Sequence, residues 1–250
     1  MRSPLALTTA ALLLASHLWA QAPVIPTLGP RTLVQSFVLC ADLPVTALPS
    51  PAPQVLGGHN TDGHQDLAPG DLVVLEGTDF TVGQRYAARR VRGGMTSIEQ
   101  RPDGIGAVQT TGWLTVTAKD ERTALARVDF TCTSIEPGDF VQAFSDLPLP
   151  AATVGQGAPD FSDRGTVLFG TDHRESFGDG DVFSIDRGTA QGLASGARLA
   201  IFRDPKNGLP LVYIGDAVVV EPSEHTSKVV LVVAKDAVSA GDVAVRRKGQ

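Results

Sequence analysis

Gly180-Asp181-Val182-Phe183 repeats, 110 residues further along the chain, the pattern of Gly70-Asp71-Leu72-Val73. A second pair of this kind, Gly138-Asp139 and Gly241-Asp242, is separated by 103 residues. The segments between these pairs keep the same order: residues 82–87 correspond to 195–200, 112–116 to 215–219, and 123–128 to 226–231. Self-similarity at a nearly constant spacing is typical of a duplicated structural unit. The sequence therefore predicts two copies of one unit, at about residues 69–144 and 165–247.

Each Gly-Asp pair is interpreted as a tight turn from which a strand leaves. Glycine adopts the positive φ that such turns require, and the neighbouring aspartate can accept hydrogen bonds from the backbone of the turn. Catalytic acids work with partner groups, and the spacing of these aspartates supplies no partner carboxylate. We therefore predict structural roles for Gly70, Asp71, Gly138, Asp139, Gly180, Asp181, Gly241 and Asp242.

One segment of the first copy favours a helix when it is considered alone. Residues 119–127 are rich in good helix formers, whereas their counterpart at 226–234 reads Thr-Ser-Lys-Val-Val-Leu-Val-Val-Ala and strongly favours a strand. If the copies share a fold, the first segment is also a strand, and Lys119-Asp120-Glu121 is its hairpin turn. About six short strands per copy are enough to close a small barrel. The predicted class is all-β, with two tandem small β-barrels or partly open sandwiches.

The N-terminus has the features of a secretory signal peptide over residues 1–22. Arg2 precedes a short apolar run, and the segment ends in Ala20-Gln21-Ala22, so we expect cleavage after Ala20 or Ala22. The apolar run is too short to span a bilayer, and no other run is long enough to do so. The sequence predicts an exported protein of the periplasm, the outer-membrane surface or the medium, without a transmembrane span.

Two stretches outside the copies are expected to be mostly irregular. Residues 23–68 are predicted to hold one N-terminal strand, at 32–40, followed by a linker rich in Pro and Gly. Residues 145–164 are the predicted linker between the copies.

The two cysteines, Cys40 and Cys132, are candidates for a disulfide. An oxidising compartment lets such a bond persist, and two cysteines leave only one connectivity. Closing a loop of roughly 100 residues stabilises the folded state by about 4 to 5 kcal/mol in the chain-entropy description. The alternative is a pair of buried, unpaired cysteines.

Charge and composition exclude several classes of function. The formal net charge is −6, and no basic stripe with interleaved aromatic residues is present, so a nucleic-acid partner is not expected. A hydrophobic content of 42% is sufficient for a packed core. Trp113, within a strand segment, is predicted to be a core residue.

Motifs for catalysis and metal binding are mostly missing from the sequence. It contains no His-Glu-x-x-His, Gly-x-Ser-x-Gly, phosphate-binding glycine loop or Cys-x-x-Cys. His59, Asp62 and His64 in a Gly-rich loop are the candidate metal ligands, although a solvated polar loop explains them equally well. Acidic residues at 172–181, with His173, form a second candidate that matches no twelve-residue calcium loop. We predict no catalytic residue and no cofactor.

Residues 182–203 resemble a known bacterial module. They read Val-Phe-Ser-Ile-Asp-Arg-Gly-Thr-Ala-Gln-Gly-Leu-Ala-Ser-Gly-Ala-Arg-Leu-Ala-Ile-Phe-Arg, which resembles the C-terminal β-barrel of flagellar assembly protein T. The segment is also similar to the β-module that follows the lysin motif (LysM) in some bacterial envelope proteins, where Gly215-Asp216-Ala217-Val218-Val219 and Ala240-Gly241-Asp242-Val243 have counterparts. The resemblance implies a non-enzymatic envelope module that packs against a larger assembly or the cell wall. The chain itself contains no lysin motif.

Three functional hypotheses follow from the sequence. The favoured one is an exported, disulfide-tied structural or binding component of the bacterial envelope, with an envelope protein assembly or the cell wall as partner. The second is a secreted all-β hydrolase or metalloenzyme whose site combines His59, His64, His173 or the nearby acids. The third, an outer-membrane β-barrel, requires girdles of aromatic residues that two tyrosines and two tryptophans do not supply. The sequence leaves the oligomeric state open.

Overall fold

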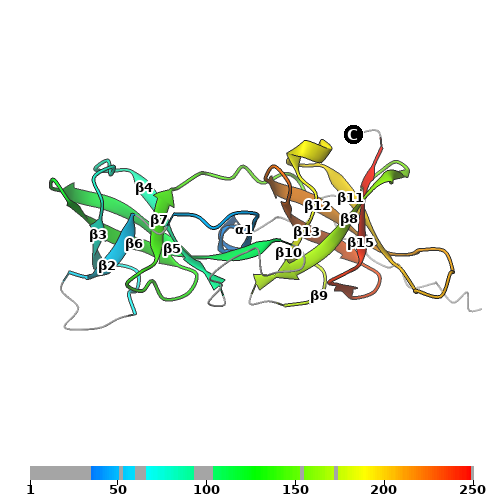
Figure 1. Ribbon diagram of the computed structural model, residues 1–250, viewed down its shortest axis with the longest axis horizontal. Coiled ribbons are helices and arrows are strands. Elements are labelled where there is room, and N and C mark those ends of the chain that lie inside the picture. Colours follow the sequence, from blue (N-terminus) through cyan, green and yellow to red (C-terminus); the bar gives the residue numbers. More distant parts are fainter. Residues whose placement is uncertain are drawn as a thin grey trace, which may run out of the picture.

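The computed structural model describes residues 35–50, 53–59, 66–92, 104–152, 155–171 and 174–248 (Figure 1). Within these ranges the regular secondary structure consists of β-strands apart from one short α-helix and short 3₁₀ turns, so the predicted all-β class is confirmed. The first half contains α1 (Gln35–Cys40), β1 (Leu43–Val45), β2 (Gln54–Gly58), β3 (Leu72–Glu76), β4 (Arg85–Val91), β5 (Gly106–Lys119), β6 (Thr123–Thr131) and β7 (Phe140–Ala143). The second half contains β8 (Pro159–Gly170), β9 (Ser176–Phe177), β10 (Val182–Ile185), a 3₁₀ turn (Thr189–Gln191), β11 (Arg198–Arg203), β12 (Val212–Pro222), β13 (Ser227–Ala234), β14 (Val238–Ser239) and β15 (Val243–Arg247).

The first half forms a seven-stranded sheet that returns on itself. Its strand order is β1-β5-β4-β7-β2-β3-β6, and β6 also pairs with β5. Strands β2 to β7 therefore make a ring, and β1 lies outside it along β5. The second half forms a closed barrel in the order β10-β13-β12-β11-β15-β8, while β9 and β14 make a separate two-stranded sheet. In Figure 1 the sheet and the barrel lie at opposite ends of an elongated molecule, with α1 between them.

The two rings share one strand order and one register. Strands β3, β6, β5, β4, β7 and β2 of the first correspond in turn to β10, β13, β12, β11, β15 and β8 of the second. Val73 lies opposite Ala126 in the first ring, and Phe183 lies opposite Val229 in the second, at the same offsets of 110 and 103 that relate the sequences. The β-bulges between paired strands also recur at equivalent positions. The structure thus repeats where the sequence repeats.

Each ring encloses its own hydrophobic core. Leu75 and Leu114 are fully buried in the first, and Ile185, Ile201 and Leu231 in the second. Because side chains alternate across a strand, every second residue of β6 points inward. Full burial of a large aliphatic side chain, such as Leu75 or Ile201, contributes roughly 1.5 to 3 kcal/mol to folding.

A third core lies on the outer face of the barrel, against the first half of the chain. The barrel contributes Val182, Val218, Val220, Val230 and Val232, and the covering residues are Val38, Ala41, Leu147, Leu149 and Ala152. Strands β12 and β13 are consequently buried on both faces, which accounts for their continuous run of apolar residues. This packing fixes α1 and the segment after β7 on the barrel.

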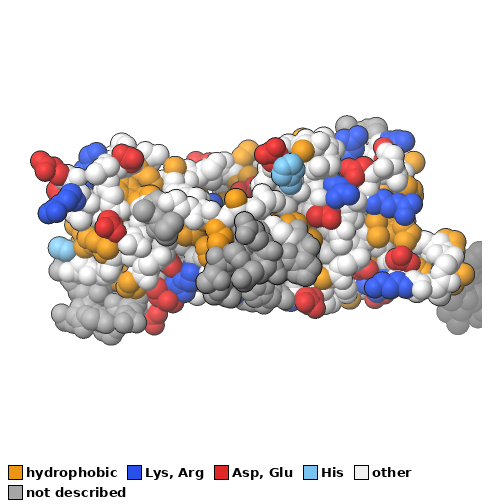
Figure 2. Space-filling model, viewed as in Figure 1, with side chains coloured by type: hydrophobic (Ala, Val, Ile, Leu, Met, Phe, Trp, Pro, Cys, Tyr) orange, Lys and Arg blue, Asp and Glu red, His pale blue; other side chains and the backbone are white. Residues whose placement is uncertain are grey.

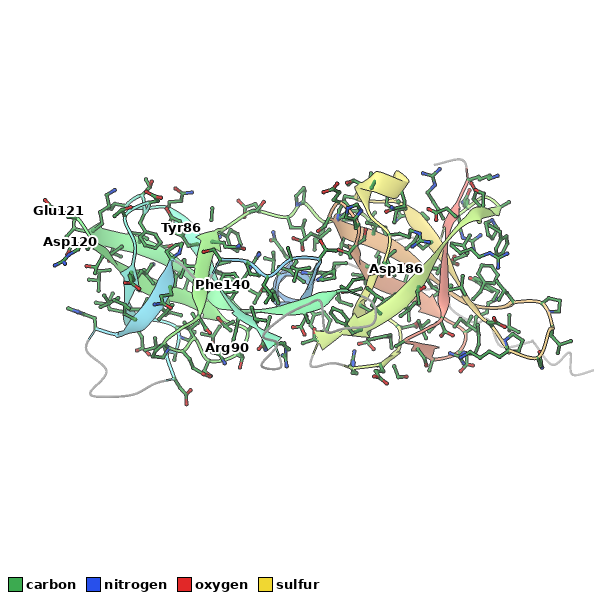
Figure 3. All side chains as sticks on the ribbon, viewed as in Figure 1. Tyr86, Arg90, Asp120, Glu121, Phe140 and Asp186 are labelled. Carbon is green, nitrogen blue, oxygen red and sulfur yellow. A yellow bond between two sulfur atoms is a disulfide. The ribbon has the colours of Figure 1, made fainter. Side chains whose placement is uncertain are left out.

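Several local predictions can be compared with the structure. Residues 123–131 form strand β6, and Asp120 caps the turn before it by accepting hydrogen bonds from the backbone N–H groups of Arg122 and Thr123 at 2.8 and 2.7 Å. The predicted strand is therefore confirmed, and the hairpin turn lies at residues 120–122, one residue later than predicted, because Lys119 still belongs to β5. Figure 3 places Asp120 and Glu121 at the far tip of this hairpin.

Other local predictions were wrong. The strand expected at 32–40 is a helix over Gln35–Cys40 in its described part: α1 belongs to none of the sheets and packs Val38 against the barrel instead. The Pro/Gly-rich stretch after it supplies β1 and β2, and β8 begins at Pro159, inside the expected linker 145–164. The predicted signal peptide lies outside the described residues. Among the described helices, none is long and apolar enough to cross a membrane.

Candidate functional site

The four Gly-Asp pairs lie in tight turns of one design. Gly70, Gly138, Gly180 and Gly241 have φ values of 97°, 93°, 84° and 90°. In each turn the aspartate carboxylate accepts a hydrogen bond from the backbone N–H three residues earlier: Ala68 to Asp71 at 2.8 Å, Glu136 to Asp139 at 3.1 Å, Gly178 to Asp181 at 2.7 Å, and Ser239 to Asp242 at 2.7 Å. These carboxylates act on the backbone of their own turns.

Two of these aspartates also bind equivalent arginines. Arg90 donates from Nε to Asp139 at 2.6 Å, and Arg203, at the corresponding position of the barrel, donates from Nη2 to Asp242 at 2.8 Å. Both aspartates are buried. The hydrogen bond to Asp242 raises the pKa of Arg203 above its usual value. These ion pairs join β4 to the turn before β7 in the first ring, and β11 to the turn before β15 in the barrel. They leave these acids little freedom for catalysis.

Cys40 and Cys132 form a disulfide, which confirms the sequence prediction. The bond joins the C-terminus of α1 to the residue that follows β6, and no free cysteine remains. Since α1 packs on the barrel, this bond ties the first sheet to the element that covers the barrel.

The candidate metal ligands do not form a described site. His59 follows β2, and its backbone N–H bonds to the carbonyl of Leu72 at 2.7 Å. Asp62, His64 and His173 lie outside the described residues. Asp181, from the second acidic group, forms an ion pair with Arg174 at 2.6 Å. Within the part of the chain that the structure describes, no three His, Cys, Asp or Glu side chains are grouped so that they could hold a metal ion.

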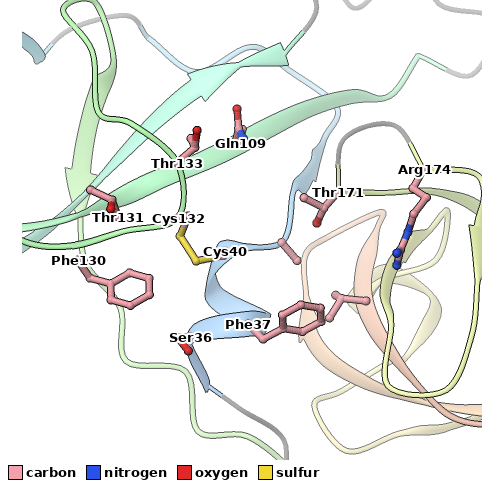
Figure 4. A pocket seen from close by; sticks show the side chains of 12 residues that line it. Ser36, Phe37, Cys40, Gln109, Phe130, Thr131, Cys132, Thr133, Thr171 and Arg174 are labelled. Atoms are coloured by element: carbon pink, nitrogen blue, oxygen red, sulfur yellow. A yellow bond between two sulfur atoms is a disulfide. The ribbon is translucent and has the colours of Figure 1, made fainter. Parts of the chain in front are cut away.

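A hollow of about 810 Å³ lies beside the disulfide, between the first sheet, α1 and the barrel (Figure 4). Its lining residues come from parts of the chain that are distant in sequence: Ser36, Phe37, Cys40, Ala41, Gln109, Phe130, Thr131, Cys132, Thr133, Thr171, Arg174 and Val182. Figure 4 shows Phe37 of α1 between Phe130 of β6 and Arg174. A volume of this size is in the range of pockets that hold small molecules or single peptide segments.

The chemistry of the hollow is apolar with a polar border. Phe37 is 54% exposed and Phe130 36% exposed, although both are large hydrophobic side chains. Trp113 stacks on Phe130 with ring centroids 4.4 Å apart and an angle of 10°, which supports the Phe130 ring from behind. Hydroxyl and amide groups of Thr131, Thr133 and Gln109 line the remaining wall.

A buried polar cluster holds α1 in place next to the hollow. Lys228 of β13 is 1% exposed; its Nζ donates to the carbonyl of Val38 at 3.1 Å and lies 3.0 Å from a carboxylate oxygen of Glu221. Burial lowers the pKa of Lys228 below its usual value. Asp42, two residues after the end of α1, pairs with Arg92 at 3.1 Å. The shape of the hollow is therefore built in advance of any ligand.

Sequence reasoning did not find this hollow. Phe37 lies in a segment that was predicted as a strand. The sequence alone does not show that the side of β6 carrying Phe130 faces α1, because that arrangement depends on the tertiary fold. The prediction that Trp113 is a core residue was wrong, because its half-buried ring stacks on Phe130 on the outer side of the sheet, opposite the inward-facing Leu114. The only signal in the sequence was Cys132, two residues after Phe130.

Comparison with known proteins gives no family for this chain. No protein-family model matches it, and no curated protein matches it.

Proposed function

We propose that this protein is an exported, non-enzymatic binding module of the bacterial envelope, built from two tandem β-barrel units that follow a cleaved signal peptide. In this proposal the hollow beside the Cys40–Cys132 disulfide binds an apolar group of a partner in an envelope assembly or the cell wall. The resemblance of residues 182–203 to the barrel of flagellar assembly protein T and to LysM-associated β-modules supports the same type of role.

The observation that carries the proposal is the pair of exposed phenylalanines in a preformed hollow. Phe37 and Phe130 expose about half and a third of their surface on the same concavity. Concave apolar surface on a soluble protein is a common mark of a binding site, because covering it with an apolar ligand releases water from both surfaces.

The rigidity of the walls also favours binding. The disulfide joins α1 to the end of β6, and Lys228 donates a buried hydrogen bond to α1 from the opposite side. A site that is already ordered loses little conformational entropy when a ligand enters. Asp181, the neighbour of the lining residue Val182, pairs with Arg174 and caps its own turn.

The test is site-specific photocrosslinking in the source bacterium. A photoreactive phenylalanine analogue replaces Phe130, and the matched control carries it at Thr117, an exposed position on β5. We expect one discrete adduct from position 130, with crosslinked partner peptides that are apolar and derive from one envelope component. Abundant competing adducts at position 117, or no adduct at position 130 in a correctly folded and exported protein, would contradict the proposal.

A further inference from the structure

The two rings are filled differently at one end. In the first ring, Phe80 and Tyr86 are 2% and 6% exposed and pack edge to face, with ring centroids 5.1 Å apart. The Tyr86 hydroxyl also accepts a hydrogen bond from the backbone N–H of Thr81 at 2.9 Å. A Cβ atom placed on Gly77 would lie 2.9 Å from Pro53 and 3.2 Å from Phe80, closer than side chains normally approach. This end of the first ring is therefore tightly closed by its own side chains.

The barrel carries smaller residues at the three equivalent positions. Gly165 stands in place of Pro53, Leu193 in place of Phe80, and Leu199 in place of Tyr86. All three line a hollow of about 210 Å³ at this end of the barrel, which we call the mouth pocket. One position changes in the opposite sense, because Arg246 replaces Ala143 on the last strand of the ring. The mouths of β-barrels are common places for small-molecule sites.

The mouth pocket has an apolar floor and a polar rim. The floor residues are at most 5% exposed: Ile185, Leu193, Leu199 and Ala244. The rim residues are Asp160, Ser162, Asp163, Arg187, Gln191 and Arg246. Figure 2 shows acidic and basic side chains next to one another over the barrel. A ligand that fits this arrangement has an apolar part for the floor and a polar group for the rim.

The acids of the rim are already paired. Arg187 donates from Nε to Asp163 at 2.8 Å, and the same guanidinium lies 3.1 Å from a carboxylate oxygen of Asp186. Asp160 lies 3.3 Å from Nζ of Lys248. Each of these carboxylates therefore has a cation of its own within the chain.

Arg246 is the charged group of the rim that remains. Its side chain is exposed, and it donates from Nη1 to a backbone carbonyl oxygen at 3.1 Å. Within the described part of the chain it forms no ion pair. Beside it, Arg198 and Arg247 line a separate recess of about 330 Å³ that no described acid lines, and Arg247 pairs with Asp216 at 2.6 Å. Arg246 thus offers one positive charge to a ligand in the mouth pocket.

We propose that the mouth pocket binds a small aliphatic carboxylate, with the apolar part on the floor and the carboxylate on Arg246. A guanidinium can form two parallel hydrogen bonds with a planar carboxylate. The volume corresponds to about seven water molecules, so the ligand is a short acid or the last residue of a peptide. The two carboxylates of the rim disfavour a doubly charged phosphate, because like charges placed together repel.

The test is an NMR titration of the methyl groups in the chain from Pro23 onward, with 4-methylpentanoate as the probe. We expect saturable shifts at Ile185, Leu193 and Leu199. The uncharged 4-methylpentanamide should bind at least about tenfold more weakly, because it loses a charge-assisted hydrogen bond. The dipeptide glycyl-leucine distinguishes the sources: tighter binding than the free acid indicates a peptide C-terminus, and weaker binding indicates a free acid.

Two variants test the residues. Arg246→Gln should raise the dissociation constant of 4-methylpentanoate at least about tenfold. Arg127→Gln, which changes an exposed arginine on β6 of the first ring, is the matched control and should leave it unchanged. Leu199→Tyr fills the pocket as the first ring is filled and should abolish the methyl shifts. If Leu199→Tyr does not fold, Arg246→Gln at the exposed rim decides the question.

Several results would overturn the proposal. They are the absence of saturable shifts up to about 100 mM probe, equal binding of the acid and the amide, or wild-type affinity in Arg246→Gln. Tighter binding of inorganic phosphate than of 4-methylpentanoate would also overturn it, because the apolar floor would then contribute nothing. The mouth pocket is independent of the hollow beside the disulfide, so Phe130→Ala should keep wild-type affinity for the probe.

Discussion

Removal of the disulfide provides the most quantitative prediction. The Cys40–Cys132 bond closes a loop with a sequence separation of 92 residues. The loop-entropy relation then gives a stabilisation of about 4.6 kcal/mol at 25 °C, which is an upper value because the unfolded chain is not a random coil. We therefore expect the double variant Cys40→Ser/Cys132→Ser to lose about 3 to 4.6 kcal/mol in its free energy of unfolding.

Urea unfolding followed by Trp113 fluorescence is the appropriate assay. Trp113 is the single tryptophan of a chain that begins at Pro23, and it stacks on Phe130, two residues from Cys132. Wild-type protein treated with dithiothreitol is the control and should unfold at the same urea concentration as the double variant. A loss below about 1 kcal/mol would refute the reasoning, since the bond would then impose almost no restraint on the unfolded chain.

Three further predictions concern the ring architecture. Gly215→Ala places a Cβ 2.5 Å from the carbonyl oxygen of Val233 and should destabilise the chain by about 1 to 3 kcal/mol in urea unfolding, whereas Gly178→Ala, whose nearest atom is at 3.8 Å, should not. Asp242→Asn removes the charge that binds Arg203 and should cost about 1 to 3 kcal/mol by the same assay; an unchanged midpoint would disprove a structural role for the turn acids. Burial is the largest cause that raises the pKa of Tyr213 from 10.0 to about 12, and the hydrogen bond to Asp216 is the next. In a Tyr86→Phe variant, where Tyr213 is the one remaining tyrosine, the tyrosinate absorbance should therefore appear with a midpoint near pH 12. A midpoint near pH 10 would contradict this.

The sign of the corresponding stability change follows from linkage. Because the folded-state pKa of Tyr213 is raised, its contribution to stability is fully present below pH 10 and is lost as the pH rises from 10 to about 12. Tyr213→Phe should remove that part of the alkaline loss.

Strands and turns were predicted best from the sequence where the second copy of the repeated unit gave independent evidence about the same segment. Residues 119–127 favour a helix by propensity, and only their counterpart at 226–234 identifies them as a hairpin turn followed by a strand. The disulfide was also predictable, because a chain with only two cysteines leaves one possible pairing.

Features that depend on tertiary packing could not be predicted. The six residues of α1 are strand-like in composition, and their helical form follows from packing on a barrel that forms far along the chain. The hollow has the same origin, because Phe37, Phe130 and Arg174 become neighbours only when the sheet and the barrel are joined. A local pattern carries no information about such a meeting of distant segments.

The central claim, an exported binding module fixed by one disulfide, is tested most directly by non-reducing peptide mapping of the protein isolated from the envelope of its source cells. The account predicts a chain that begins at Gln21 or Pro23, with the Cys40 and Cys132 peptides covalently linked. An uncleaved chain that begins at Met1, found in the cytoplasm with two free thiols, would contradict it.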